Sequence, residues 1–494
     1  MEIKTLGDFL SFFTKNKKIK LTRKDRENVK KTRSVLEDLV TKQKIYGVNT
    51  GVGALLDVEI TEENFEKFQR CLILEHACGV GDIAKKEITK GALLLLINCL
   101  KKGYSGVSLE TLDFLVNLFN KDRIPTAPEI GSLGASGDLI PLAHMMLPFV
   151  GKGSFWVDSG LYGSQVISKI SPTKDVITAP KLKMGEAIFL INGTHFTTSM
   201  FAFVVSGAMD IYFVSDVVTA FTAEALGYNF DAFSGKVNDL KKHSGQHISA
   251  LNLGCYLSDK QNSEIKSLQD GYSIRCAPQV HGSIIDIVEI TKKTLEAEFQ
   301  SISHNPAVFT DSHTIVSGGN FHAQPIAVTA DSLGVSLATI ASISERRVER
   351  ILNTHTSHLP PFLSDCPGLS SGLMMLQYAA ASLVSRNGVL IHPASVGSIS
   401  VSGSQEDFVS MATTAVWKAG EILENSWKVL AIEAMCAVKA ISIQRVKPCL
   451  ENEFLREVFE KICDKTSFLK EADDLSGDIK TVTKILKEVW SEAC

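Results

Sequence analysis

The spacing of apolar residues along the chain predicts long helices. In residues 21–40, apolar side chains recur at helical intervals after Thr22, a residue type that caps helices. These side chains are Val29, Val35, Leu36 and Leu39. Further helical patterns cover residues 88–102, 197–226, 330–353 and 404–441, and several exceed the usual helix length of about a dozen residues.

The alternation typical of strands is scarce, and it is limited to short pieces such as residues 153–158 and 307–318. The two most apolar segments are residues 189–228 and 371–384. Acidic residues interrupt the first, and the second is too short to span a bilayer easily. We therefore predict a mainly α fold with minor β elements, in which both apolar segments are buried core helices and the long helices occupy the C-terminal half.

The chain contains no internal repeat and no Pro- or Ser-rich linker. Its most loop-like interval is residues 171–187. This interval indicates a division between an N-terminal part, residues 1–190, and a long-helix part, residues 191–494. We expect the second part to complete the active site of the first, so that both form one integrated catalytic unit.

Composition and charge narrow the class of protein. The 494 residues are 45% hydrophobic and 21% charged, as in soluble globular proteins. The net charge is −4 without a basic stripe, which favours a small polar ligand over nucleic acid. The N-terminus lacks the apolar run of a signal peptide, and the ten cysteines form no CxxC pair. We expect a cytoplasmic protein with reduced thiols, no metal site and no association with membranes.

The segment GSLGASGDLIPLAH, residues 131–144, carries the candidate chemistry. Its glycine spacing does not fit a phosphate loop, a dinucleotide fingerprint or a nucleophile elbow. An Ala-Ser-Gly tripeptide can instead cyclise when the Gly137 nitrogen attacks the Ala135 carbonyl carbon. Loss of water and of the Ser136 hydroxyl then produces an electrophile without an external cofactor. The alternative is a structural glycine turn, with Asp138 capping a helix over residues 139–147.

Residues 124–147, IPTAPEIGSLGASGDLIPLAHMML, closely resemble the signature of the aromatic amino acid ammonia-lyase family. Other motifs resemble the family's in the same order along nearly the whole chain. They are YGVNTGVG with Tyr46, FLINGT with Asn192, LQDGYSIRCAPQVHG with Gln269, Tyr272 and Arg275, SGGNFHAQP with Phe321, SISERR, PASVGSI, and SQEDFVSM with Glu406.

The resemblance implies a large helical-bundle lyase fold and a group that the chain makes from itself. In the family, Ala-Ser-Gly forms a 4-methylidene-imidazol-5-one (MIO), here from Ala135, Ser136 and Gly137, and no external cofactor is needed. Family members are homotetramers whose active sites are shared between subunits. We therefore expect a homotetramer whose substrate is a small molecule, an amino acid.

The resemblance also implies roles for individual residues. Tyr46 would be the base that takes the β-proton, for which its phenol pKa of about 10 must be lowered. Arg275 would bind the substrate carboxylate, since its donors match both oxygens. Asn192 and Tyr272 would form hydrogen bonds around the electrophile and the amine, and Gln269 and Phe321 complete the expected site. Taken singly, Tyr46 could be a packed aromatic and Arg275 a surface ion-pair partner, although the sequence RCAPQV indicates an apolar setting for this arginine.

Two residues indicate the substrate. His76, three positions before Gly79, matches histidine-selective members, and Glu406 can accept an imidazole N–H that a phenyl ring lacks. The resemblance therefore implies conversion of L-histidine to trans-urocanate and ammonia. Each residue also has a structural alternative. His76 could be a helix histidine that is already hydrogen-bonded, and Glu406 could be an acid at a helix N-terminus, favoured by the helix dipole.

Four positions depart from the family pattern and keep other substrates open: Glu75, His304, Gly397 and Phe408. Glu75 adds a carboxylate beside His76, which could raise the pKa of the imidazole or alter the pocket. The alternatives are a tyrosine or phenylalanine ammonia-lyase, a 2,3-aminomutase of the same family, and a helical scaffold without activity. Ring formation removes two waters from the chain, so the intact mass separates the scaffold from the enzymes.

Overall fold

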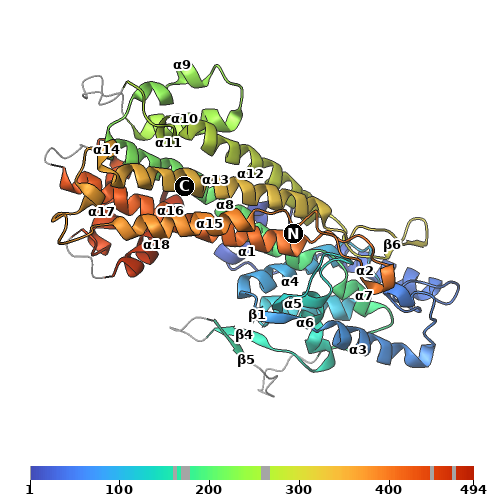
Figure 1. Ribbon diagram of the computed structural model, residues 1–494. Coiled ribbons are helices and arrows are strands. Elements are labelled where there is room, and N and C mark those ends of the chain that lie inside the picture. Colours follow the sequence, from blue (N-terminus) through green and yellow to red (C-terminus); the bar gives the residue numbers. More distant parts are fainter. Residues whose placement is uncertain are drawn as a thin grey trace. The chain divides into compact units, whose positions relative to one another are not determined.

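The structure is a computed structural model that describes residues 2–158, 164–167, 179–257, 268–444, 450–469 and 474–493. The chain divides into two compact units (Figure 1). The first unit comprises residues 1–203, 292–330 and 393–417, and the second comprises residues 204–291, 331–392 and 418–494. The division predicted from the sequence, residues 1–190 and 191–494, is of another kind, because it describes two parts of the chain that together form one catalytic unit. That division stays a prediction.

Helices dominate both units, as predicted. The first unit contains α1 (Leu6–Thr14), α2 (Arg23–Leu39), α3 (Phe65–His76), α4 (Lys86–Leu100), α5 (Leu109–Asn120), α6 (Ile140–Met146) and α7 (Glu186–Ile191). The second contains α9 (Gly235–Asn238), α10 (Ser244–Tyr256), α11 (Tyr272–Arg275), α14 (Thr354–Ser357), α15 (Met374–Leu390), α17 (Glu453–Lys465) and α18 (Leu475–Ala493). Four long helices have residues in both units: α8 (His195–Leu226), α12 (Ala277–Gln300), α13 (Gln324–Leu352) and α16 (Ala412–Ile443).

The strands are short, and those in the described ranges belong to the first unit. Antiparallel pairs join β1 (Val80–Ile83) to β3 (Pro128–Ile130) and β6 (Ala307–Phe309) to β7 (Thr314–Val316). A three-stranded sheet has the order β2 (Ile124–Pro125), β4 (Phe155–Asp158), β5 (Ser164–Ile167). The strand pieces predicted over residues 153–158 and 307–318 are therefore confirmed. Of the predicted loop-like interval, residues 171–178 lie outside the described residues, and α7 begins at Glu186.

The helix predicted after Thr22 forms as its sequence pattern requires. Thr22 accepts the main-chain N–H of Asp25, and the Asp25 carboxylate accepts the N–H of Thr22, so the two residues form a capping box. Val29 and Leu36 of the apolar stripe are buried. The helix predicted over residues 88–102 is α4, whose residues from Gly91 to Leu100 are all buried. This helix is apolar on every side because it forms part of the core of the first unit.

The long helices pack against one another in the second unit (Figure 1). Asp216 of α8 binds His281 of α12, and Ser426 of α16 donates to the carbonyl of Leu337 of α13. By length and composition α8 and α13 could cross a membrane, but 61% and 56% of their most apolar stretches are buried inside the chain. Burial of this kind is what we predicted for the apolar segment 189–228.

The burial predicted for residues 371–384 is wrong. This segment enters α15, in which only Leu376, Ala380 and Asn387 are buried. Met375, Tyr378 and Val389 are each more than half exposed. Apolar composition favours burial but does not determine it, because a helix needs neighbours on several sides to bury more than a narrow stripe.

The start predicted for the last long helix is also wrong. α16 begins at Ala412 rather than at residue 404. Residues Ser402–Ser404 form a 3-10 turn, and Val401 pairs with Glu406 in an isolated antiparallel bridge. Glu406 therefore lies before the helix, and the interpretation as a helix N-terminal acid is ruled out.

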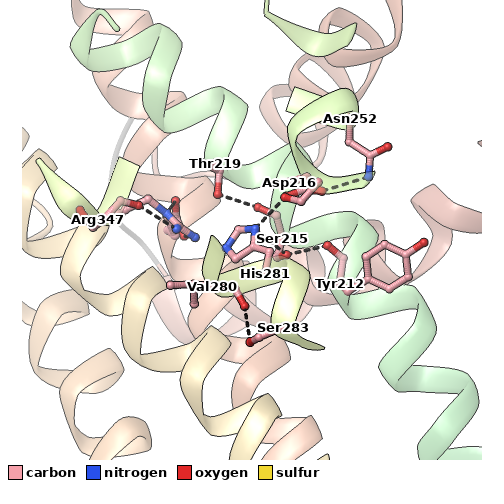
Figure 2. Close-up of polar contacts among 12 residues, drawn as sticks. Tyr212, Ser215, Asp216, Thr219, Asn252, Val280, His281, Ser283 and Arg347 are labelled. Atoms are coloured by element: carbon pink, nitrogen blue, oxygen red, sulfur yellow. Dashed lines mark hydrogen bonds and ion pairs between the residues drawn. The ribbon is translucent and has the colours of Figure 1, made fainter. Parts of the chain in front are cut away.

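A buried pair of hydrogen-bonded side chains, Asp216 and His281, lies in the core of the second unit (Figure 2). Asp216 Oδ1 is 2.7 Å from His281 Nδ1, and both side chains are fully buried. Ser215 contacts the same ring nitrogen at 3.2 Å. A catalytic Ser-His-Asp triad needs serine and aspartate on opposite ring nitrogens, so this cluster lacks the geometry of a hydrolase.

Candidate active site

The Ala135-Ser136-Gly137 tripeptide is held against the segment that follows α7. Gly137 has a φ of +77° and pairs with Gly193 in a parallel bridge. A Cβ on Gly137 would lie 2.3 Å from the Gly193 carbonyl oxygen. The next residue, Asp138, donates its main-chain N–H to that same oxygen at 2.7 Å. Only glycine fits at position 137, both for its backbone conformation and for the close approach of the two chains.

Two side chains bind Ser136. Its hydroxyl donates to Glu406 Oε1 at 3.1 Å, and its main-chain carbonyl accepts the Asn192 amide at 2.9 Å. Asn192 follows the last residue of α7, and its side-chain oxygen accepts the main-chain N–H of Asn305 at 2.6 Å. Ala135 and Ser136 are both buried. The structure thus brings together the predicted residues Ala135, Ser136, Gly137, Asn192 and Glu406.

Asp138 does not cap the helix that follows it. α6 begins after Leu139 and has no side-chain cap. The buried Asp138 carboxylate instead accepts the main-chain N–H groups of Phe196 and Thr197, at 2.6 and 3.1 Å, in the first turn of α8. It also accepts the Ser132 and Thr197 hydroxyls. Burial raises the pKa of Asp138 to about 6, against the effect of these donors.

The Tyr46 hydroxyl accepts the main-chain N–H of Gly53 at 2.8 Å. Burial raises the pKa of this phenol above its ordinary value, and the nearby charge of Glu406 acts in the same direction. The lowered pKa that a general base requires is therefore not produced by the described residues of the single chain. A positive charge close to the phenol would be needed to lower it.

His76 is the last residue of α3 and lies within electrostatic reach of Glu406. Burial lowers the pKa of its imidazole. The charge of Glu75 acts in the raising direction, as expected, but burial is the larger effect. The loop after His76 is fixed by Gly79, whose main-chain N–H donates to His144 Nε2 at 2.9 Å. Since this nitrogen accepts a hydrogen bond, the His144 ring is neutral.

Three further predicted residues form a group in the second unit. Arg275 donates to Gln269 Oε1 at 2.7 Å, and its guanidinium lies 4.7 Å from the centre of the Tyr272 ring. Tyr272 is 71% exposed and Arg275 is half-buried. The Arg275 Nε is buried and has no hydrogen-bond partner within the described residues. The apolar setting expected for Arg275 stays a prediction.

Phe321 lies in the first unit, in the turn before α13 and beside His322. The His322 ring stacks on Phe408, which is two residues after Glu406. His304 is fully buried, with Nε2 3.0 Å from the Tyr104 carbonyl oxygen. Burial lowers the pKa of His304 to about 4.

Sequence reasoning missed three residues that hold the site in place. His144 binds the loop after His76, Asn305 binds the Asn192 side chain, and Arg347 binds the carbonyl of Ser273 in α11. His144 and Arg347 lie in two of the motifs that resemble the family's, LIPLAH and SISERR. The spacing of residues in these motifs does not indicate which partners the two side chains bind. In the described part of the chain, no group of His, Cys, Asp and Glu is arranged to hold a metal ion.

Comparisons with known proteins agree with this geometry. The family model for aromatic amino acid lyases matches residues 5–464. Histidine ammonia-lyase of Caldanaerobacter subterraneus subsp. tengcongensis is 39% identical over 490 residues, which cover 98% of this chain and 95% of that protein. Histidine ammonia-lyase of Bacillus subtilis is 39% identical over 467 residues, covering 94% and 91%.

Solved structures give the same family likeness. The crystal structure of histidine ammonia-lyase from Trypanosoma cruzi has a TM-score of 0.88 and 33% identity, and it covers 99% of this chain and 92% of that one. Tyrosine aminomutase from Streptomyces globisporus has a TM-score of 0.89 and 28% identity, covering 100% and 97%.

Proposed function

The chain belongs to the aromatic amino acid lyase family, and from this premise we propose that it is an ammonia-lyase that converts L-histidine to trans-urocanate and ammonia. The observation that carries the proposal is the placement of Glu406. Its carboxylate contacts Ser136 and lies within electrostatic reach of His76, two residues predicted from distant motifs. The similarity to histidine ammonia-lyases over nearly the full chain supports the same substrate.

We further propose that Ala135, Ser136 and Gly137 form the MIO group. The residues fit this group, because Gly137 lacks a Cβ that would clash with Gly193, and Ser136 carries a leaving group on its β-carbon. The Asn192 amide is in place to hold the ring carbonyl, which derives from Ser136. When formed, the group supplies an electrophile for the substrate amine.

The roles of the other residues follow from their chemistry. Tyr46 removes the β-proton, for which its raised pKa must fall when a cationic group enters the site. Arg275 binds the carboxylate, with Gln269 and Tyr272 beside it. His76 and Glu406 hold the imidazole ring, and Phe321 lines the site.

We infer a homotetramer whose active sites are shared between subunits. The exposed Tyr272, and the exposed apolar residues Met375, Tyr378 and Val389 of α15, support association, because such side chains are commonly buried at interfaces. We also infer a cytoplasmic location. The eight cysteines within the described residues are all free thiols, as expected in a reducing compartment.

The test is to mix the purified protein separately with histidine, tyrosine and phenylalanine and to follow the conjugated acrylate in the ultraviolet. We expect urocanate from histidine and no acrylate from the other two. The Tyr46→Phe variant is the control, since it removes the base and should lower kcat by about 10²-fold or more.

Consumption of tyrosine without turnover of histidine would contradict the proposal that histidine is the substrate. A β-amino acid product would identify an aminomutase. An intact mass equal to that of the translated chain would exclude the MIO group.

A further inference from the structure

We propose that the Glu406 carboxyl is the acid that expels the Ser136 hydroxyl as water while the Ala-Ser-Gly tripeptide matures. The inference rests on the proposed function, because it concerns how the electrophile of that function is made. It gives Glu406 a catalytic task that precedes any contact with substrate.

The contact that carries the proposal is the hydrogen bond between Ser136 Oγ and Glu406 Oε1, 3.1 Å long. In the described part of the chain, no other side chain is hydrogen-bonded to this hydroxyl. Ser136 is 8% exposed, so bulk water has little access to the oxygen that must leave. A carboxyl group at this distance can pass a proton directly to the hydroxyl oxygen.

The fold fixes Glu406 at this position. Glu406 and Val401 exchange main-chain hydrogen bonds of 3.3 and 3.0 Å across the turn. The Ser402 hydroxyl in the same turn accepts the main-chain N–H of Ala54 at 3.2 Å. Further along the segment, Met411 donates its main-chain N–H to the carbonyl of Leu133 at 2.9 Å. The segment that carries the carboxyl is thus tied to the reactive loop itself.

Maturation requires two losses of water. In the first, a bond forms between the Gly137 nitrogen and the Ala135 carbonyl carbon. The Ala135 oxygen leaves as water with the protons of the Gly137 and Ser136 main-chain nitrogens. In the second, the Ser136 Cα–H and Cβ–Oγ bonds break and a Cα=Cβ double bond forms. Both steps are dehydrations, so neither needs an oxidant or a reductant.

The second loss is the step that needs an acid. Hydroxide is a poor leaving group, so Oγ must gain a proton as its bond to Cβ breaks. In the structure the Ser136 hydroxyl donates to the Glu406 carboxylate, so Glu406 must take up a proton before this step. The protonated carboxyl then gives its proton to Oγ, and the carboxylate that is left takes the proton released from Cα, so that Glu406 ends the step as it began it. The Asn192 amide, donating to the Ser136 carbonyl, stabilises the negative charge that develops there when Cα loses its proton.

Other titratable groups near the tripeptide are engaged elsewhere. The Asp138 carboxylate accepts the N–H groups at the start of α8. The Tyr46 hydroxyl oxygen accepts the main-chain N–H of Gly53. Glu406 is therefore the acid that the geometry assigns to the Ser136 hydroxyl.

The test is the intact mass of the purified full-length Glu406→Gln variant. The parent protein should be lighter than its translated chain by two waters, and Glu406→Gln by one, because its ring closes but keeps the serine hydroxyl. Asp407→Asn removes the neighbouring, exposed carboxyl and should still lose two waters. Loss of two waters from Glu406→Gln would overturn the proposal. A mass equal to that of the translated chain would also overturn it, because Glu406 would then be needed for ring closure itself.

A second comparison separates this step from ring closure and from misfolding. Ser136→Ala has no hydroxyl to expel and should lose one water. Combining it with Glu406→Gln should leave that single loss unchanged, whereas a double variant at the translated mass would contradict the proposal. Failure of the proposed function would look different, because the parent protein itself would then lose no water.

Discussion

The carboxylate of Asp138 accepts the main-chain N–H of Phe196 at 2.6 Å. The residue directly after the Ala135-Ser136-Gly137 tripeptide thus holds the start of α8, the helix that follows Asn192 and Gly193. A negative charge at this end of a helix is favoured by the unpaired N–H groups and by the helix dipole. One carboxylate therefore joins the tripeptide to the segment that carries its hydrogen-bonding partner Asn192.

Replacing Asp138 with asparagine should destabilise the protein. Oδ2 accepts both N–H groups of α8, whereas Oδ1 accepts the Ser132 and Thr197 hydroxyls. An amide nitrogen in place of either oxygen cannot accept, so the donors that face it lose their acceptor. We expect the free energy of unfolding to fall by about 1–3 kcal/mol, the cost of a buried unpaired polar group. Denaturant unfolding above pH 7, where the carboxylate is ionised, measures the change. Asp407→Asn is the matched control, and an equal loss in both variants would refute the capping role.

Two glycine substitutions should separate backbone strain from close contact. Gly137 and Gly151 have similar positive φ angles, +77° and +72°. A Cβ at Gly137 would lie 2.3 Å from a carbonyl oxygen, whereas one at Gly151 would meet nothing within 4 Å. Gly151→Ala should lower the free energy of unfolding by about 1 kcal/mol from strain alone, and the chain should still lose two waters. Gly137→Ala should cost more and lose none, as judged by intact mass, and ring formation in Gly137→Ala would contradict the role of the contact.

The sequence predicts features of the fold that depend on near neighbours in the chain. The Thr22 cap and α4 follow from local spacing, and both are confirmed. The partner of Asp138 lies 58 residues away, and the exposure of α15 depends on which elements reach it, so the sequence-based interpretations of both were wrong. In the site, motifs indicated Ser136, Asn192 and Glu406, but the hydrogen bonds that join them cross 56 and 270 positions and are visible only in the fold.

The stability of the protein should fall in acid because of His304. Its pKa, lowered by burial to about 4, lies below the ordinary value of 6.5 that it has when unfolded. As the pH falls from 6.5 to 4, the unfolded chain takes up the proton first, so stability present above pH 6.5 is lost. The loss from this group should approach about 3 kcal/mol, at about 1.4 kcal/mol per pH unit.

The variant His304→Gln should show a shallower loss over that range, because it keeps a donor for the Tyr104 carbonyl but cannot titrate. Urea unfolding at several pH values measures the slope. His195, whose pKa burial lowers to about 3, should leave a residual slope. His243→Gln, at an exposed position, should behave like the parent protein. If His304→Gln keeps the full slope, His304 does not cause the acid sensitivity.

Arg347 should govern substrate affinity through α11, although no substrate role was predicted for it. It pairs with Glu433 through two hydrogen bonds of 2.5 and 2.9 Å, and both side chains are fully buried. Its remaining nitrogen donates to the carbonyl of Ser273 at 3.2 Å, in the turn that carries Tyr272 and Arg275. A lysine keeps the charge for Glu433, but a single ammonium cannot reproduce the planar fork that reaches both partners.

We expect Arg347→Lys to raise the KM for histidine about tenfold, the equivalent of one charged hydrogen bond worth about 1.5 kcal/mol. The loss of two waters should be unchanged, since the tripeptide belongs to the first unit. Arg346→Lys is the control, because that side chain is 60% exposed and pairs with Glu345. Steady-state kinetics and intact mass on the same samples separate the outcomes. An unchanged KM would show that the contact with Ser273 does not position α11, and loss of the mass change would point to a general folding defect instead.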